Sequence, residues 1–300
     1  MNRPLDCILC LLECRLRDLI KLGVSENSIG TSICKIKDLL RYDRTTAFVE
    51  SFEIIKRVTG KIDPYADTKK RLKTLAEKVL RKMNSVIKSI NFIHLIRIAA
   101  AANVFDTQVL GYVFNEATVE YRLIHEKPLI DETNLINWHK IKHIVYILDN
   151  HGEAVFDRFV ISKLIEQGYN VTVIVRGSAY EIDVTIDDAL ELFKDISVNI
   201  VSVKGSYPAL YAHKASREIL NTLEESDIII AKGIANLEAY LDSKKRIDKQ
   251  ILFLLRAKCP VISALLKVPR SASIAVTNRK VQDLAKAFND LKSKPVTVHT

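Results

Sequence analysis

The sequence predicts an α/β protein with a Rossmann-like, doubly wound, mostly parallel sheet preceded by an all-helical N-terminal region. After Pro128 and Trp138, short β-branched runs alternate with helical segments, which is typical of parallel strands joined by helical crossovers. Before that point apolar residues recur three or four positions apart, as in helices, and we expect no strand there. We therefore predict a helical bundle or cap, in one or two subdomains, over residues 1–137 and an α/β domain over residues 138–300.

Each predicted element follows from its pattern of apolar residues. In the first region we expect helices over 6–22, 44–58, 64–90 and 93–104, where apolar residues share one face. In the second we expect strands over 144–148, 171–175, 198–203, 227–231, 251–255 and 273–276. The helices between and after them are expected over 153–167, 186–193, 213–223, 235–241 and 280–291. This alternation brings the strand ends to one edge of the sheet, where open α/β sheets bind their ligands.

The stretch from His143 to Asp157 connects the sheet to a possible site. Its five apolar residues, Ile144 to Leu148, are followed directly by Asp149 and Asn150. Carboxylate and amide oxygens at a strand end suit magnesium, manganese or calcium better than zinc. Asp and Asn are also common turn formers and helix caps, so the spacing alone leaves both interpretations open.

Polar side chains recur at the ends of other predicted strands. They are Asp183 after the second strand, Lys232 and Asn236 after the fourth, and Lys258 after the fifth. Taken singly, each is compatible with a helix cap or a solvated position. Taken together, carboxylates and an amide flanked by lysines are the groups that metal-assisted phosphoryl chemistry uses. We expect these side chains to gather at one edge of the sheet.

The net charge of +9 is concentrated in one segment. Between Lys56 and Lys88, eleven Lys and Arg residues accompany three acidic ones, an excess of eight positive charges. The segment lacks the interleaved aromatic residues of a surface that binds single-stranded nucleic acid. We therefore expect a solvated helix face, able to steer anionic substrates, and no nucleic-acid partner.

The apolar stretches predict neither export nor membrane insertion. The first residues carry charges among the leucines, and the stretches near 93–104 and 251–268 are short or interrupted by Arg and Lys. We expect a cytoplasmic protein whose five cysteines are not joined in disulfides. Cys7, Cys10 and Cys14 would lie along one face of the first helix. Because no His or second C-x-x-C completes a zinc pattern, buried thiols are the preferred interpretation over a redox or metal site.

In combination, several of these blocks resemble the metal-dependent damage-control phosphatases, the family of domain of unknown function 89, in its archaeal-type members. The resemblance extends over almost the whole chain, and its most specific parts are the D-N-x-G-E and K-G-x-x-N-x-E patterns. The blocks that carry it are Cys7 with Cys10, Asn103 with Asp106, L-D-N-H-G-E at 148–153 with Asp157, Asp183, A-K-G-I-A-N-L-E at 231–238, and R-A-K-C at 256–259.

The resemblance implies a helical region packed on the α/β domain, with a divalent metal held at the junction by Asp149, Asn150 and Asp183. The metal would be magnesium or manganese, with cobalt or nickel as alternatives. The implied activity is a phosphatase that hydrolyses phosphorylated small metabolites, such as sugar phosphates or phosphopantetheine-like compounds. Asp149 and Lys232 would be catalytic, with Asp149 as ligand only or also as nucleophile. The implied phosphate- and substrate-binding residues are Lys232, Asn236, Lys258, Asn103 and Asp106.

Two further carboxylates lie four positions apart on one predicted helix face, Glu153 and Asp157. One of them would hold a metal ligand in its orientation without touching the metal, and a solvated or capping role is the alternative.

The chain departs from the family pattern at three positions where glycine is frequent, which here are Ala102, Ala209 and Ala235. Because glycine lets a ligand approach the backbone closely, these changes bear on the choice of substrate.

Two other functions compete with the phosphatase. An S-adenosylmethionine-dependent carboxyl methyltransferase would need a glycine-rich loop after the first strand, where D-N-H-G supplies one glycine. The dinucleotide pattern G-x-G-x-x-G and the P-loop are both absent from the sequence. A basic nucleic-acid-binding protein would use the segment between Lys56 and Lys88, and its binding would weaken steeply with salt.

Overall fold

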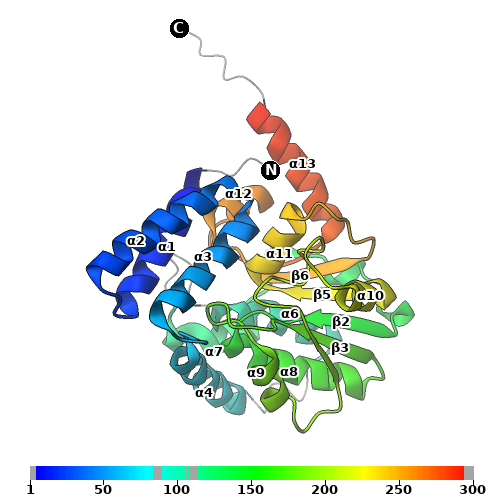
Figure 1. The fold of residues 1–300 in the computed structure, drawn as a ribbon. Coiled ribbons are helices and arrows are strands. Elements are labelled where there is room, and N and C mark those ends of the chain that lie inside the picture. Colours follow the sequence, from blue (N-terminus) through cyan, green and yellow to red (C-terminus); the bar gives the residue numbers. More distant parts are fainter. Residues whose placement is uncertain (1–4, 84–89, 106, 108–113, 294–300) are drawn as a thin grey trace.

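Runs of Ile, Val and Leu form the centre of the molecule, a seven-stranded sheet of order β1-β7-β6-β5-β2-β3-β4 (Figure 1). Strands β2 to β6 are mutually parallel, whereas β7 is antiparallel to β6 and parallel to β1. The computed structural model describes residues 5–83, 90–105, 107 and 114–293. The strands are β1 (Ile130–Asp131), β2 (His143–Ile147), β3 (Asn170–Val175), β4 (Asn199–Ser202), β5 (Ile228–Lys232), β6 (Ile251–Arg256) and β7 (Ser273–Thr277).

Helices cover both faces of the sheet, because its central strands are apolar on both sides. One face packs against α4 (Ala66–Lys82), α6 (Phe92–Ala102), α7 (Glu116–His125), α8 (His151–Glu166) and α9 (Ile186–Leu192). The other packs against α10 (Arg217–Glu225), α11 (Gly233–Asp242), α12 (Pro260–Leu266) and α13 (Asn278–Ser293). The short 3-10 helices are η1 (Leu39–Arg41), η2 (Asn103–Phe105), η3 (Thr133–Leu135) and η4 (Trp138–Lys140).

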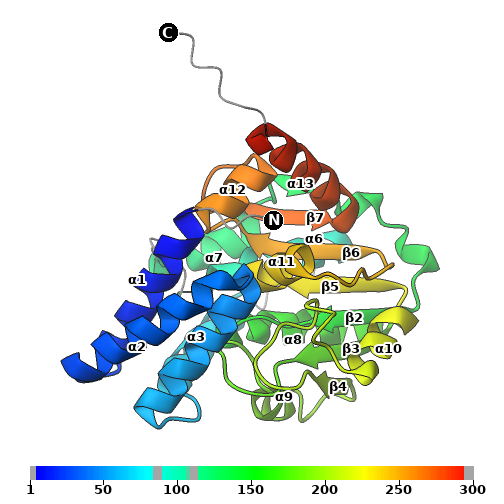
Figure 2. The same ribbon diagram turned by 45° about the horizontal axis from the view of Figure 1, so that its top comes forward.

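Three further helices form a layer at one end of the sheet, as Figure 2 shows. They are α1 (Leu5–Lys21), α2 (Glu26–Asp38) and α3 (Arg44–Thr59), and they pack on one another. This layer is attached to the α/β part through α11, where Asp242 accepts hydrogen bonds from the Thr45 backbone N–H at 3.1 Å and the Thr45 hydroxyl at 3.0 Å. The attachment places α1 and α3 over the carboxyl ends of the strands.

The predicted fold class is confirmed, and all six predicted strands are present. The expectation of no strand before residue 138 is wrong, because the two-residue strand β1 pairs with β7; a strand of this length leaves no alternating pattern to detect. Helices α2, α7 and α12 were not expected either. The predicted helix over 64–90 ends at Lys82, and residues 84–89 lie outside the described part.

The division at residues 137 and 138 stays a prediction. In the structure the predicted helical half contributes in two ways, since α1 to α3 form the separate layer and α4, α6 and α7 cover one face of the sheet. The alanines at 99–102 are fully buried, and their small size lets α6 approach α8 closely. Residues from both predicted halves therefore share one hydrophobic core.

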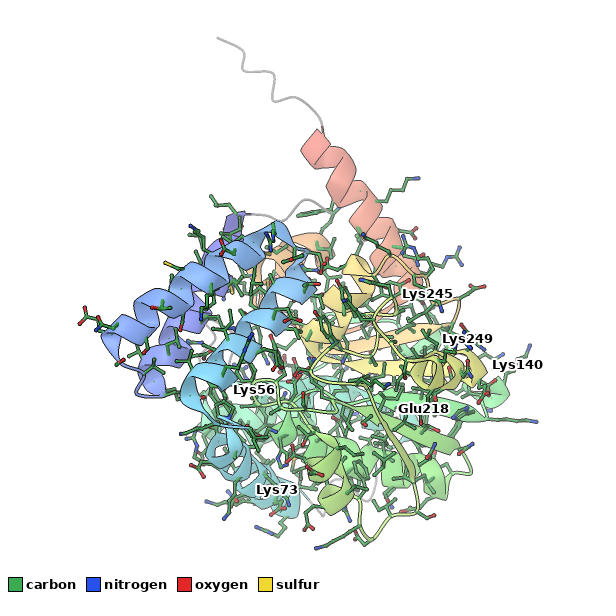
Figure 3. The ribbon with its side chains drawn as sticks, viewed as in Figure 1. Lys56, Lys73, Lys140, Glu218, Lys245 and Lys249 are labelled. Atoms are coloured by element: carbon green, nitrogen blue, oxygen red, sulfur yellow. The ribbon has the colours of Figure 1, made fainter. Side chains whose placement is uncertain are left out.

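The basic residues are distributed over several surfaces. Figure 3 shows Lys56 and Lys73 on α3 and α4, and Lys140, Lys245 and Lys249 on the side where β2 and β6 begin. Within the basic segment, Lys69 is buried between Asp63 and Asp188, with ion pairs of 2.7 and 2.8 Å. In the described residues, no helix has the length and apolar character needed to cross a membrane.

Candidate active site

Backbone pairing beyond the end of β2 brings two carboxylates to the same place. The Val184 N–H donates to the Asp149 carbonyl at 2.8 Å, and the His151 N–H donates to the Ile182 carbonyl at 2.8 Å. The loop that carries Asp183 is thereby held against the segment that follows β2. The side chains of Asp149 and Asp183 both line one cavity and are nearly buried, at 6% and 7% exposure.

Asn150 lies between these carboxylates in the chain and forms an antiparallel bridge with Asp183. Its side-chain oxygen accepts a hydrogen bond from the Glu153 N–H at 3.1 Å and so caps α8. The amide nitrogen of Asn150 is buried and has no hydrogen-bond partner among the described residues. The hydrogen bond that caps α8 uses one of the two lone pairs of the Asn150 amide oxygen, so the cap does not exclude a role as a metal ligand.

Gly233 leaves room for the Asp149 carboxylate. Its φ of +76° lies in the left-handed region, and a Cβ atom added there would fall 1.9 Å from Asp149 Oδ2. Any side chain at this position would displace the carboxylate as well as strain the backbone. The glycine after Lys232 is thus required by the position of Asp149.

Asn103, from η2, supports this carboxylate from the side of the sheet covered by α6. Its buried amide nitrogen lies 3.3 Å from Asp149 Oδ2 and 3.0 Å from Glu153 Oε2, and its oxygen accepts the Arg256 N–H at 2.9 Å. Helix α6 therefore ends in a residue that connects β2, α8 and β6.

A fully buried charge cluster lies behind Asp149. The Lys232 ammonium donates to Asp157 Oδ1 at 2.9 Å and to the Ala99 carbonyl, and lies 3.4 Å from Glu153 Oε2. The Tyr146 hydroxyl also donates to Asp157 Oδ1, at 2.6 Å. One ammonium faces two carboxylates here, so the cluster carries one negative charge if all three are ionised.

Burial sets the protonation of these groups. It raises the pKa of Glu153 to about 7 and also raises the pKa of Asp157, although the nearby Lys232 ammonium opposes both shifts. Burial alone would lower the pKa of Lys232, but Asp157 and Glu153 outweigh it and raise that pKa. The lysine thus stays charged, and burial favours the protonated form of both carboxyl groups.

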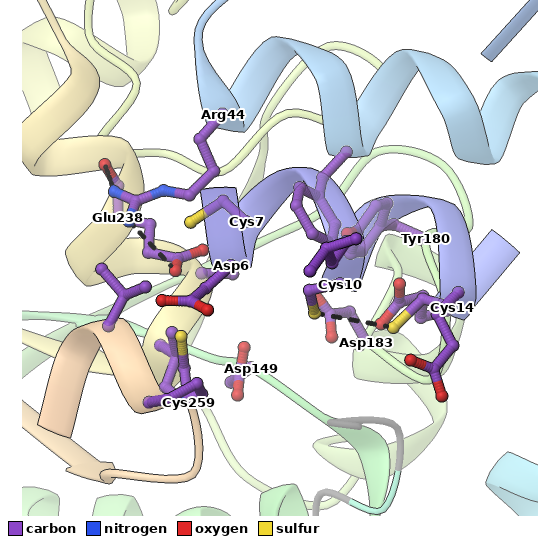
Figure 4. A pocket seen from close by; sticks show the side chains of 18 of the residues that line it. Asp6, Cys7, Cys10, Cys14, Arg44, Asp149, Tyr180, Asp183, Glu238 and Cys259 are labelled. Carbon is purple, nitrogen blue, oxygen red and sulfur yellow. Dashed lines mark hydrogen bonds and ion pairs between the residues drawn. The ribbon is translucent and has the colours of Figure 1, made fainter. Parts of the chain in front are cut away.

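The cavity has a volume of about 360 Å³ and lies between the strand ends and the layer of α1 and α3 (Figure 4). Its lining includes Asp149, Asp183, Glu181, Arg44, Glu238 and Arg270. Arg44 is 4% exposed, with Nη1 3.3 Å from Glu238 Oε1, and its Nε and Nη1 make no hydrogen bond with described residues.

The structure separates the predicted site residues into two groups. Asp149 and Asp183 line the cavity. Lys232, Lys258 and Asn103 are completely buried and do not line it, and neither does the buried Asn150. Lys258 donates to the Asn103 carbonyl. Asn236 donates to the Lys232 carbonyl at 2.8 Å and borders a much smaller cavity. Asp106 lies outside the described residues.

Glu153 and Asp157 are both 0% exposed, so the alternative in which their side chains are solvated is wrong. The cavity lining also contains residues for which the sequence predicts no role, among them Arg44, Glu181 and Glu238. Glu238 is the last residue of the K-G-x-x-N-x-E pattern, and this position in a family pattern was the sequence feature that could have indicated a role in the site. No sequence feature could have indicated Arg44 and Glu181, because they come from distant segments that only the tertiary structure brings together.

The cysteines of α1 border the same cavity. Cys7 and Cys14 are buried and Cys10 is half-buried, and all three line it together with Cys259. The Sγ atoms of Cys10 and Cys14 are 3.9 Å apart. Among the described residues, no three His, Cys, Asp or Glu side chains lie close enough to hold a metal ion.

A family model, the damage-control phosphatase ARMT1-like domain, matches residues 5–274. The chain belongs to this family. A damage-control phosphatase of Pyrococcus horikoshii is 28% identical over 237 residues, covering 77% of this chain and 79% of that protein. A damage-control phosphatase of Archaeoglobus fulgidus is 29% identical over 215 residues, covering 70% and 74%.

A solved structure supports the same fold. The crystal structure of a P. horikoshii protein of the family of domain of unknown function 89 superposes with a TM-score of 0.79 at 24% identity, covering 93% of this chain and 99% of that one. The predicted resemblance to the damage-control phosphatases is thus confirmed, and the names of the relatives support a phosphatase.

In this ARMT1-like protein we expect Gly233→Ala to reduce any activity that depends on Asp149 by at least tenfold and to lower stability. The added methyl group would meet the Asp149 carboxylate, in addition to the cost of about 1–2 kcal/mol for an L residue in the left-handed region. Urea unfolding and turnover measure the two effects.

Gly60→Ala is the matched control for that substitution, because Gly60 has a φ of +66° and nothing within 4 Å of an added Cβ. It should show the backbone cost alone and keep its activity. Equal loss of activity in both variants would contradict the role given to Gly233.

Lys232→Met should destabilise this ARMT1-like protein by about 3–5 kcal/mol, because it leaves Asp157 and Glu153 buried without their cation. Urea unfolding measures the change. Lys194→Met is the control, since the Lys194 ammonium pairs with Glu191 on the surface and should be nearly neutral. A Lys232→Met protein as stable as the control would show that the buried carboxylates are protonated and need no partner.

Proposed function

We propose that this protein is a metal-dependent phosphomonoesterase that acts on a phosphorylated small metabolite. The observation that carries the proposal is the convergence of Asp149 and Asp183 on one cavity at the carboxyl ends of parallel strands, beside the buried amide of Asn150. Ligands bind at this position in open α/β sheets. Family membership and the names of the two relatives support phosphatase chemistry.

The donor set fits a hard divalent cation. Asp149 and Asp183 would supply carboxylate oxygens, although Asp183 Oδ2 also accepts a hydrogen bond from Arg176 Nε. The Asn150 oxygen retains a lone pair beyond its hydrogen bond to the Glu153 N–H. Oxygen ligands of this kind suit magnesium or manganese, with cobalt or nickel as alternatives. When bound, such a cation would neutralise phosphoryl charge and lower the pKa of a water molecule.

The residues of the chain position the reacting groups. Gly233 and Asn103 hold the Asp149 carboxylate from two sides, in a position where Asp149 lines the cavity. This preorganisation is the main way in which phosphoryl transfer is accelerated. Asp149 acts either as a ligand alone or as a nucleophile whose oxygen attacks phosphorus and releases the alcohol. An acid-quenched reaction that retains label from ³²P-substrate on the protein would identify the nucleophilic route.

Lys232 places its ammonium group behind Asp149, where the carboxylates of Asp157 and Glu153 balance its charge. Its ammonium is engaged with Asp157 and the Ala99 carbonyl, so direct contact with a phosphate would require it to leave those partners. In the cavity lining itself, the cations are Arg44 and Arg270. A cavity of about 360 Å³ suits a small metabolite such as a sugar phosphate or part of a phosphopantetheine-like compound.

We expect metal-stripped protein to release no phosphate from a panel of sugar phosphates and an aryl phosphate, and to regain activity with magnesium, manganese, cobalt or nickel. Asp149→Asn and Asp183→Asn should each lower turnover at least a hundredfold, because a neutral amide binds a cation less strongly. Calorimetric titration with manganese should show weaker binding in both variants, independently of turnover.

The control for these substitutions is Asp195→Asn, which removes a surface carboxylate paired with Arg158. It should leave metal binding and turnover unchanged. Turnover by the wild type without metal would refute the proposal. Binding of S-adenosylmethionine, or salt-dependent binding of nucleic acid that is indifferent to Asp149→Asn, would favour the competing functions instead.

A further inference from the structure

Helix α1 presents an apolar stripe to solvent. Leu5, Leu9, Leu16 and Ile20 are 68%, 56%, 39% and 61% exposed. With 3.6 residues per turn, these positions lie on one face of the helix, together with the half-buried Leu12. Single exposed apolar residues are ordinary, but a continuous stripe of this length marks a binding surface.

The stripe is not used inside the described chain. The opposite side of α1 packs into the protein, where Leu11 and Leu19 belong to two hydrophobic clusters shared with α2 and α3. Helix α1 contacts α2, α3 and α12. The exposed leucines of α1 are therefore additional to those that its own fold requires.

The charges beside the stripe are divided between the two ends of the helix. All the exposed charged residues of α1 lie on one flank of the stripe, as their spacing shows. Along the helix, the acidic residues Asp6 and Glu13 come before the basic residues Arg17 and Lys21, with Glu13 at the middle of the helix. Such a helix is complementary to itself when it is turned end for end.

We propose that α1 is the contact surface for a second copy of this chain, in a two-fold symmetric dimer in which the two α1 helices pack antiparallel. A two-fold axis pairs residue i with j and residue j with i. Leu5 opposite Ile20 and Leu9 opposite Leu16 share one midpoint, between positions 12 and 13. All four exposed apolar residues are then covered in a single register.

The same register brings opposite charges together. With the midpoint between positions 12 and 13, Asp6 falls opposite position 19 of the other helix. This position is midway between Arg17 and Lys21, about 3 Å along the axis from each at a rise of 1.5 Å per residue. Flanking charges of this kind select partner and orientation in paired helices. Glu13 lies next to the axis, so its two copies face each other and oppose association.

The composition of the flank favours a protein partner over a lipid surface. Helices that lie on membranes carry Lys and Arg beside their apolar face, whereas half of the flanking charges on α1 are acidic. A single helix about 25 Å long covers less than the ~800 Å² per partner of a standard interface. The dimer is therefore expected to be weak and concentration-dependent.

The proposed dimer also has a defined relation to the cavity. Leu9 and Glu13 belong both to this surface of α1 and to the cavity lining. A partner helix on the stripe would therefore lie against residues that also line the cavity. This inference does not depend on the proposed phosphatase activity, and its test does not measure activity.

Sedimentation velocity of the full chain over a range from low micromolar to near-millimolar concentration tests the proposal. The weight-average mass should rise from 34.0 kDa toward twice that value. Leu9→Glu with Leu16→Glu should hold the protein at the monomer mass without lowering its melting temperature, because both side chains are exposed. Tyr121→Glu with Leu190→Glu is the matched control on α7 and α9, and should dimerise like the wild type.

Charge variants test the register. Arg17→Asp should weaken association at least tenfold, and Asp6→Arg combined with Arg17→Asp should restore it. Glu13→Gln should strengthen association, which no role of Glu13 within one chain predicts. A wild type that stays monomeric at every concentration would overturn the proposal, as would a Leu9→Glu, Leu16→Glu protein that dimerises normally. Failure of the paired charge reversal to restore association would overturn the antiparallel register.

Discussion

The contact between the Asp149 carboxylate and the backbone of Gly233 is the constraint on which the candidate site depends. The first turn of α11 approaches the end of β2 so closely that a Cβ atom would overlap the carboxylate. This approach is possible because β2 and β5 are hydrogen-bonded neighbours in the sheet. The position of Asp149 is therefore set by the order of the strands and by the absence of a side chain at one residue, and Asn103 completes its support.

Behind this contact the protein buries several ionisable groups without access to water. Such burial is costly unless the groups are paired and hydrogen-bonded, and Lys232, Asp157 and Glu153 are paired. The arrangement connects β5 with α8 and, through the Ala99 carbonyl, with α6. One buried cation thus joins elements from both halves of the chain.

The layer of α1 to α3 covers the edge of the sheet at which the candidate site lies and so encloses the cavity there. Without it, Asp149 and Asp183 would lie in an open crevice at the strand ends. With it, the cavity gains Arg44 from α3 and the thiols of α1, and it shares Leu9 with the apolar stripe of α1. The same helix therefore has one side that packs, one edge that lines the cavity, and one face available to another molecule.

Local sequence patterns were sufficient to predict the alternation of strands and helices, the polar residues at the strand ends and the family resemblance. These are local features, because the spacing of apolar residues and the residues that form turns can be recognised within a short segment of the chain. Whether Lys232 and Lys258 face the cavity or lie behind it was decided by tertiary packing, as was the recruitment of Arg44 and Glu181. Strand β1 escaped prediction for the same reason, since its two residues are a strand only because β7 lies beside them. Contacts between distant segments depend on how the layers pack, and no local pattern records them.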